Sequence, residues 1–342
     1  SREVTDGDMM GLESKFAYAT GRVRVLETRL LDRGRIDRMI DAPDLEAALK
    51  VLAEAGYGRV QPSERTYLEI DDITAGEEAR LIQLVRETTP EPALVDFIAA
   101  RWDFHNLKAM MKAKLHRVAP EKAVAKHGAC DLAVIERAVD GETRDLPQHL
   151  ARAFSVAKAA HDLRPVPETI DIAVDREMYS YLLTLAKSIG IAYLVDLVQT
   201  EVDLFNLSVY FRSRRMGRDK AFAAEAMVPG GRLNPMRLLA SYEQPPEAVG
   251  ASVTGTGYEA LAAQAATALA EGKPLSDLET LSEQVMWERI RKARYMPLGP
   301  GPLVGYVFAK LHELKLVRLI LVGKLSGVPR ESLKERLRDV HV

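Results

Sequence analysis

The sequence has little of what builds disulfides, membrane spans or targeting segments. Its 342 residues include one cysteine, Cys130, so no internal disulfide can form and a reducing compartment is expected. The longest apolar stretch, residues 299–311, is interrupted by Pro302 and Lys310, and it falls short of the roughly 18 to 20 residues that span a bilayer. Residues 1–11 lack the apolar centre of a signal peptide. We expect a cytoplasmic protein that is still able to lie against a membrane.

Motifs for nucleotide, metal and nucleophilic chemistry are also missing. The glycines at 230–231 are followed by Arg232 and not by the Lys-Ser/Thr of a phosphate-binding loop. His312-Glu313 has no second histidine at zinc-motif spacing, and Cys130 has no sequence signature of a nucleophile. We expect no catalytic residue, no cofactor and no metal, and therefore a protein that works by binding partners.

The charge balance narrows the class of partner. The net charge of -2 argues against a nucleic-acid binder, which is usually strongly basic. The charge is uneven, however, since residues 285–338 hold 12 lysines and arginines against 4 glutamates. This local excess suits an acidic protein surface or anionic lipid headgroups.

The apolar pattern is that of helices throughout. Phe16, Val23 and Leu30 belong to a series that steps by three and four residues, which places its members on one helix face. A longer stripe of the same spacing runs through residues 94–115. No convincing series of alternating strands appears, and the Pro/Gly-rich pieces are short. The sequence predicts an all-α fold.

The chain also repeats itself. Residues 96–108 and 196–208 share their apolar pattern, an aspartate at the eighth position and an Asn-Leu pair that follows it. The shared residues are Asp103, Asn106 and Leu107 in the first copy, and Asp203, Asn206 and Leu207 in the second. Each Asp and Asn are three residues apart and lie on one helix face. We favour internal bonds to neighbouring backbone as their role, and a contact shared with a partner is the alternative.

A third copy is weaker. In residues 306–318, Glu313 stands in place of the aspartate and Leu316 in place of the asparagine. A period near 100 residues is longer than that of ordinary solenoid repeats. We therefore predict three helical repeats, at residues 1–118, 119–217 and 218–342, each with one long signature helix.

Basic residues follow the signature in every copy. They are Lys108, Lys112 and Lys114 in the first, Arg212, Arg214 and Arg215 in the second, and Arg318 and Lys324 in the third. A solvated helix face explains any single cluster. Recurrence in all three copies favours a positive rim, and we predict that these eight residues bind a partner.

Several segments together resemble a known family, the C subunits of the V-type and A-type rotary ATPases, which are relatives of the eukaryotic V-ATPase d subunit. They are residues 16–31, which begin Phe-Ala-Tyr-Ala-Thr-Gly-Arg, the Leu-Ala-Glu-Ala-Gly-Tyr-Gly of 52–58, and the signatures at 101–108 and 201–207. Their order and spacing carry the resemblance, which covers nearly the whole chain. Gly56 and the Gly-Thr-Gly-Tyr of 255–258 depart from the family's usual pattern.

The resemblance implies a funnel with a central cavity, formed by three repeats related by pseudo-threefold symmetry. It implies a non-catalytic central-rotor subunit, present once per complex and peripheral on the cytoplasmic face of the cell membrane. Such a subunit links the central shaft of D and F subunits to the membrane proteolipid ring. It transmits torque for ATP-coupled proton or sodium transport.

Other classes stay open from sequence alone. An all-helical adaptor or scaffold of unrelated signalling role would have the same composition. An enzyme with an unrecognised helical active site would show a pocket that gathers shifted carboxylates or histidines. A nucleic-acid binder that uses the basic C-terminal third is disfavoured by the near-neutral overall charge.

Overall fold

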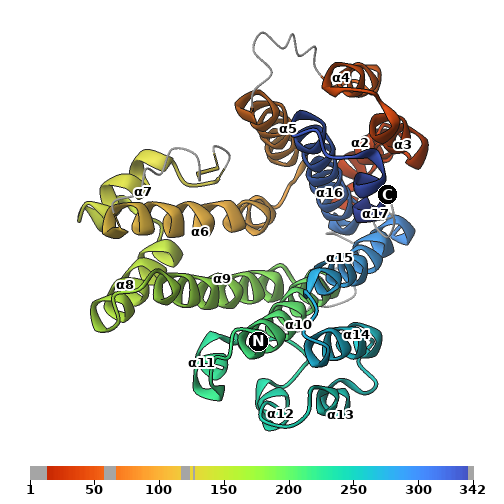
Figure 1. The fold of residues 1–342 in the computed structure, drawn as a ribbon. Helices are drawn as coiled ribbons and strands as arrows, with labels where there is room; N and C mark the ends of the chain where they lie inside the picture. The colour runs from red at the N-terminus through yellow and green to blue at the C-terminus, as the bar shows by residue number, and fades with distance from the viewer. Residues whose placement is uncertain (1–13, 58–66, 117–123, 126–127, 338–342) are drawn as a thin grey trace. The chain divides into compact units, whose positions relative to one another are not determined.

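A computed structural model describes residues 14–57, 67–116, 124–125 and 128–337. All the regular elements in these ranges are helices, which confirms the predicted all-α class (Figure 1). The chain forms two compact units, residues 1–95 with 287–342 and residues 96–286. The predicted repeat boundaries after residues 118 and 217 stay a prediction, and the first lies outside the described ranges.

The first unit combines helices from both ends of the chain. Its N-terminal helices are α2 (Ala17–Glu27), α3 (Arg33–Asp41), α4 (Leu45–Glu54) and α5 (Tyr67–Thr88). Its C-terminal part holds the end of α15 (Ser276–Arg291), η3 (Lys292–Tyr295), α16 (Pro300–Leu325) and α17 (Arg330–Leu337). Helix α16 packs against α2, α4 and α5 (Figure 1). The core of this unit therefore joins apolar residues of 31–70 to those of 314–333.

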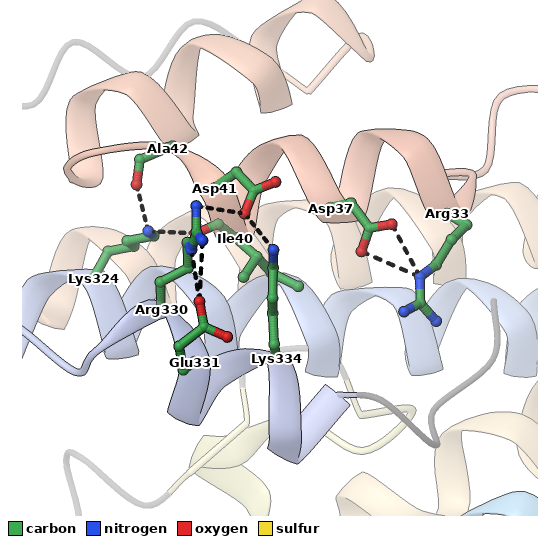
Figure 2. A network of polar contacts seen from close by, with 9 residues as sticks. All are labelled: Arg33, Asp37, Ile40, Asp41, Ala42, Lys324, Arg330, Glu331 and Lys334. Atoms are coloured by element: carbon green, nitrogen blue, oxygen red, sulfur yellow. Dashed lines mark hydrogen bonds and ion pairs between the residues drawn. The ribbon is translucent and has the colours of Figure 1, made fainter.

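Polar contacts reinforce this junction at the C-terminal end of α3 (Figure 2). The ammonium of Lys324 donates to the carbonyl oxygens of Ile40 and Ala42. Lys334 lies 2.8 Å from the carboxylate of Asp41 and Arg330 lies 3.6 Å from it. The hydrogen bond from Lys334 is the main cause of a lowered pKa at Asp41. Cations are favoured at a helix C-terminus because its last carbonyls carry partial negative charge.

The second unit contains two of the signature helices. They are α6 (Pro92–His116), whose first residues precede the unit boundary, and α10 (Ala192–Arg215). Between them lie α7 (Leu132–Val139), η1 (Thr143–Asp145), α8 (Gln148–Leu163) and α9 (Pro167–Ile189), and α9 packs against both α8 and α10. Arg101 of α6 and Glu201 of α10 form an ion pair at 2.8 Å.

The remaining helices of this unit surround the C-terminal half of α10. They are α11 (Lys220–Ala226), α12 (Pro235–Ala240), η2 (Pro246–Val249), α13 (Gly250–Val253), α14 (Glu259–Ala270) and most of α15. Their apolar side chains form one core with those of α10, from Leu204 to Leu278. The largest buried side chains in it include Tyr210, Phe211 and Tyr258.

A buried carboxylate fastens α10 to the chain that follows it. Asp203 is fully buried and accepts hydrogen bonds from the Leu233 amide at 2.8 Å and the Tyr258 hydroxyl at 3.0 Å. Asn206 exchanges two hydrogen bonds with the backbone of Val228, at 2.8 and 2.9 Å. Burial raises the pKa of Asp203, so these donors are needed to hold its charged form.

Helix α6 repeats this arrangement. Asp103 accepts from the amides of Ala129 at 3.2 Å and Cys130 at 3.0 Å. Asn106 exchanges two hydrogen bonds with Ala125, at 2.9 and 2.7 Å. The interpretation that the Asp and Asn of each signature bond neighbouring backbone is thus confirmed in both copies.

In the third signature helix, α16, the corresponding carboxylate finds its partners at the opposite end of the chain. Glu313 is 1% exposed and accepts from the Leu31 amide and the Tyr57 hydroxyl. Lys310 also donates to it, at 2.6 Å. Residues 31–57 therefore supply hydrogen-bond donors to Glu313, just as the segment that follows α10 supplies them to Asp203.

The register of the three sites supports this equivalence. In each site the residue after the bonded amide accepts a hydrogen bond at the N-terminus of the next helix. These capping residues are Asp131 for α7, Asn234 for α12 and Asp32 for α3. The bonded tyrosine also follows the bonded amide at nearly the same spacing in two sites. Tyr57 follows Leu31 by nearly as many residues as Tyr258 follows Leu233.

A glycine is required where the following segment crosses each aspartate. A Cβ on Gly231 would lie 2.1 Å from the Oδ1 of Asp203, and one on Gly128 would lie 2.0 Å from the Oδ1 of Asp103. Both glycines stand two residues before a bonded amide, that of Leu233 and that of Cys130. The close approach of backbone to carboxylate therefore excludes any side chain at these two positions.

We predict that Gly231→Ala destabilises the second unit by about 1–3 kcal/mol, because the added methyl overpacks a buried, fully bonded carboxylate. Gly250→Ala is the matched control in the same unit, since a Cβ there meets nothing within 4 Å. Chemical denaturation of both variants, followed by circular dichroism, measures the difference. Equal midpoints for the two variants would contradict the required close approach.

Candidate functional site

The eight basic residues predicted to bind a partner all contact acceptors within their own unit. On α6, Lys108 pairs with Asp175 at 2.6 Å and Lys112 pairs with Asp171 at 2.8 Å, both carboxylates being on α9. Lys114 pairs with Asp140. Burial raises the pKa of Asp175 while the ammonium of Lys108 lowers it. Lys108 and Lys112 thus help to hold α6 against α9.

The second cluster forms the last turn of α10. Arg212 pairs with Glu279 of α15, and Arg215 donates to the carbonyl of Lys273. Arg214 donates to the Gln244 carbonyl at 2.7 Å and to the Tyr210 hydroxyl at 2.9 Å. Its guanidinium also lies over the Tyr210 and Tyr242 rings, at 5.4 and 5.9 Å from their centroids. These cations complement the negative C-terminal end of the helix.

The two residues of the third cluster have different environments. Arg318 pairs with Asp71 of α5 at 2.8 Å and is about half exposed, at 55%. Lys324 donates to the Ile40 carbonyl at the end of α3 (Figure 2), and burial lowers the pKa of its ammonium. The two residues therefore differ in their freedom to meet another molecule.

Exposure separates the eight residues into two groups. Lys108 keeps only 20% of its side chain exposed, whereas Lys114, Arg212 and Arg318 keep 45%, 53% and 55%. Exposed ion pairs contribute roughly 0–1 kcal/mol and exchange partners readily. Arg215 is exposed as well, so it and the last three are the better placed to contact another molecule. Their acceptors could not be identified from sequence because they lie in other segments of the chain.

The described residues offer little for catalysis. They contain no group of three or more histidine, cysteine, aspartate or glutamate side chains able to hold a metal ion. Burial raises the pKa of the Cys130 thiol to about 11, which disfavours the thiolate. His149 stacks on Tyr181 at 4.1 Å between ring centroids, and burial lowers its pKa. Within the same ranges, no helix combines the length and apolarity of a membrane span.

Comparison with known proteins gives a consistent family. The sequence model of the ATP synthase (C/AC39) subunit family matches residues 19–336. The C subunit of the V-type sodium ATPase of Enterococcus hirae is 24% identical, over 93% of this chain and 97% of the relative. The C subunit of the V-type ATP synthase of Thermus thermophilus is 27% identical, over 94% and 98%. The C subunit of the A-type ATP synthase of Pyrococcus abyssi is 21% identical, over 98% and 93%.

The matched residues include all three signature helices. They also include the N-terminal segment whose Leu31 and Tyr57 donate to Glu313 of the third. The extent of the match confirms the resemblance inferred from the sequence motifs, and it gives no support to a signalling adaptor. Subunits of this kind are accessory parts of an ATPase complex. This chain belongs to the ATP synthase (C/AC39) subunit family of V-type and A-type ATPases.

Proposed function

We propose that this chain is the non-catalytic central-rotor subunit of a V-type/A-type ATPase. It links the central shaft of D and F subunits to the membrane proteolipid ring and transmits torque for ATP-coupled proton or sodium transport. The family match over residues 19–336 is the observation that carries the proposal. One copy per complex would lie on the cytoplasmic face of the membrane, bound to protein and not to nucleic acid.

The local bonding suits a part that transmits force. Asp103, Asp203 and Glu313 are each 0–1% exposed and each accept at least two hydrogen bonds. Fully satisfied buried polar networks fix one arrangement of the helices that carry them. We propose that the three signature helices belong to three repeats related by pseudo-threefold symmetry, around a central cavity that receives the shaft.

The eight basic residues remain our proposal for the contact surface. Lys114, Arg212 and Arg318 have side chains that are about half exposed, and together with the exposed Arg215 they supply most of its available charge. Positive surfaces of this kind accelerate association with acidic partners and help to fix their orientation. An acidic shaft surface is the proposed partner, and contact with anionic headgroups is the other use of the same charge.

We expect the tagged chain to copurify with the shaft subunits and the proteolipid ring when membranes from the source cells are solubilised gently. Mass spectrometry of the purified material identifies these subunits, and the same cells without the tag give the background. Recovery of an unrelated signalling complex in place of ATPase subunits would refute the proposed role.

We predict that Arg212→Glu weakens binding to a purified D–F shaft by about tenfold and flattens the dependence of affinity on salt. The reversed charge would repel an acidic shaft surface, and salt screens such interactions. Arg33→Glu is the matched control, because it makes the same charge change at an arginine outside the three clusters, one that pairs with Asp37. Isothermal calorimetry at several salt concentrations measures the effect. Indistinguishable affinities for the two variants would remove the second cluster from the contact surface.

A further inference from the structure

A cavity of about 320 Å3 in the first unit carries an excess of positive charge. It lies between α2, the end of α4, α5 and α16, and its charged lining residues are Arg22, Arg29, Arg80, Lys310 and Glu77. Its size is at the lower end of the range for small-molecule sites, roughly 300–1,000 Å3. Nothing in the proposed rotor function uses this cavity.

Three of its four cations pair with neighbouring carboxylates, and one of these pairs is Lys310 with Glu313 at 2.6 Å. Arg22 lies 3.4 Å from Glu87, and Arg80 pairs with Glu77. Glu313, at the base of Lys310, is already bonded to three donors. The hydrogen-bond donors of the cavity that still lack a protein acceptor therefore belong mainly to side chains other than Arg22 and Arg80.

Arg29 is the first of these groups. By register it stands where the other two signature sites have Gly128 and Gly231, two residues before the bonded amide. The carboxylate at this site belongs to the longer Glu313, and the position carries a side chain. The side chain of Arg29 forms no hydrogen bond or ion pair with another described residue, although its charge partly opposes the raised pKa of Tyr306. It is therefore a cation with unused donors at the wall of the cavity.

Tyr306 is the second. Its side chain is only 7% exposed, and its hydroxyl makes no hydrogen bond to another described residue. Burial raises its pKa to about 12, so the phenol keeps its proton at neutral pH and remains a donor. The hydroxyl is not among the fully buried polar atoms that lack a partner, so it faces the cavity and can donate to a molecule there.

Lys310 is the third. Its side chain is 11% exposed, and it donates to the Tyr57 hydroxyl at 2.9 Å and to Glu313 at 2.6 Å. An ammonium has three donors, so one remains after these two bonds. The carboxylate of Glu77 stands 3.9 Å away, beyond hydrogen-bond distance.

We propose that this cavity binds a small molecule through a phosphate group. Arg29, Tyr306 and Lys310 offer unused donors from two different helical segments, and a ligand that satisfies them must be an acceptor with negative charge. A phosphate accepts from several directions at once, whereas a carboxylate accepts mainly in one plane, and both Arg and Lys bind phosphate well. Because Arg29 follows α2 and the other two lie on α16, a bound phosphate would also stabilise the first unit by joining both ends of the chain.

The test uses the full chain and inorganic phosphate as the probe, with sodium chloride at equal ionic strength as the reference. We expect saturable heat on calorimetric titration and a saturable rise in melting temperature. Arg29→Gln should weaken apparent phosphate affinity about tenfold, since it removes a charge-assisted hydrogen bond, and Tyr306→Phe should weaken it by a smaller factor. Arg33→Gln, at an exposed arginine of the same unit, should leave affinity unchanged.

Two outcomes would overturn the proposal. Phosphate also stabilises proteins generally because it is excluded from their surfaces, so an equal rise in melting temperature in wild type and Arg29→Gln would show only that effect. Citrate tests the carboxylate class: tighter binding of citrate than of phosphate, with the same dependence on Arg29, would reject a phosphate site. Arg29 is exposed, so its variant should fold, and circular dichroism checks this. The test involves no other subunit of the ATPase, so its outcome is independent of the rotor proposal.

Discussion

The burial of one carboxylate on each signature helix is the constraint on which the rest of the structure depends. A charged group removed from water is costly unless donors replace the lost hydration. At Asp203 the donors are a backbone amide and a tyrosine hydroxyl, so the chain after α10 must pass at one place and at one distance. That requirement determines the glycine at 231 and the start of α12 at the next capping residue. Helix packing alone would tolerate several paths for this segment, and the carboxylate selects one.

The same constraint at Glu313 links the two ends of the chain. Its partners Leu31 and Tyr57 lie 282 and 256 residues away in sequence. Apolar contacts between residues 31–70 and 314–333 accompany these bonds. The first unit therefore cannot be completed until α16 has been made. The segment that bonds the carboxylate follows the signature helix at Asp203, whereas at Glu313 it lies at the opposite end of the chain.

Much of this was predictable from the sequence, because helical periodicity and the Asp-x-x-Asn spacing are local signals. The all-α class, the equivalence of residues 96–108 and 196–208 and the internal use of Asp103 and Asp203 all follow from them. The closing partners of Glu313 were not predictable, since no local pattern connects Leu31 to a helix at the other end of the chain. The acceptors of Arg212 and Arg318 were missed for the same reason. A signal did exist for the glycines: each stands shortly before an Asp or Asn that caps the next helix.

The third copy differs from the other two in ways that depend on one another. The longer Glu313 replaces an aspartate, Leu316 replaces the asparagine, and Arg29 occupies the position held by glycine at the other sites. In the first two copies the backbone passes so close to the carboxylate that only glycine fits, whereas at Glu313 the same register position carries a side chain. The change gives up one pair of backbone bonds and leaves Arg29, Lys310 and Tyr306 around a cavity with donors to spare. Divergence of the third copy therefore has a physical consequence beyond weaker symmetry, because an unpaired cation and a tyrosine hydroxyl then line the same cavity of the first unit.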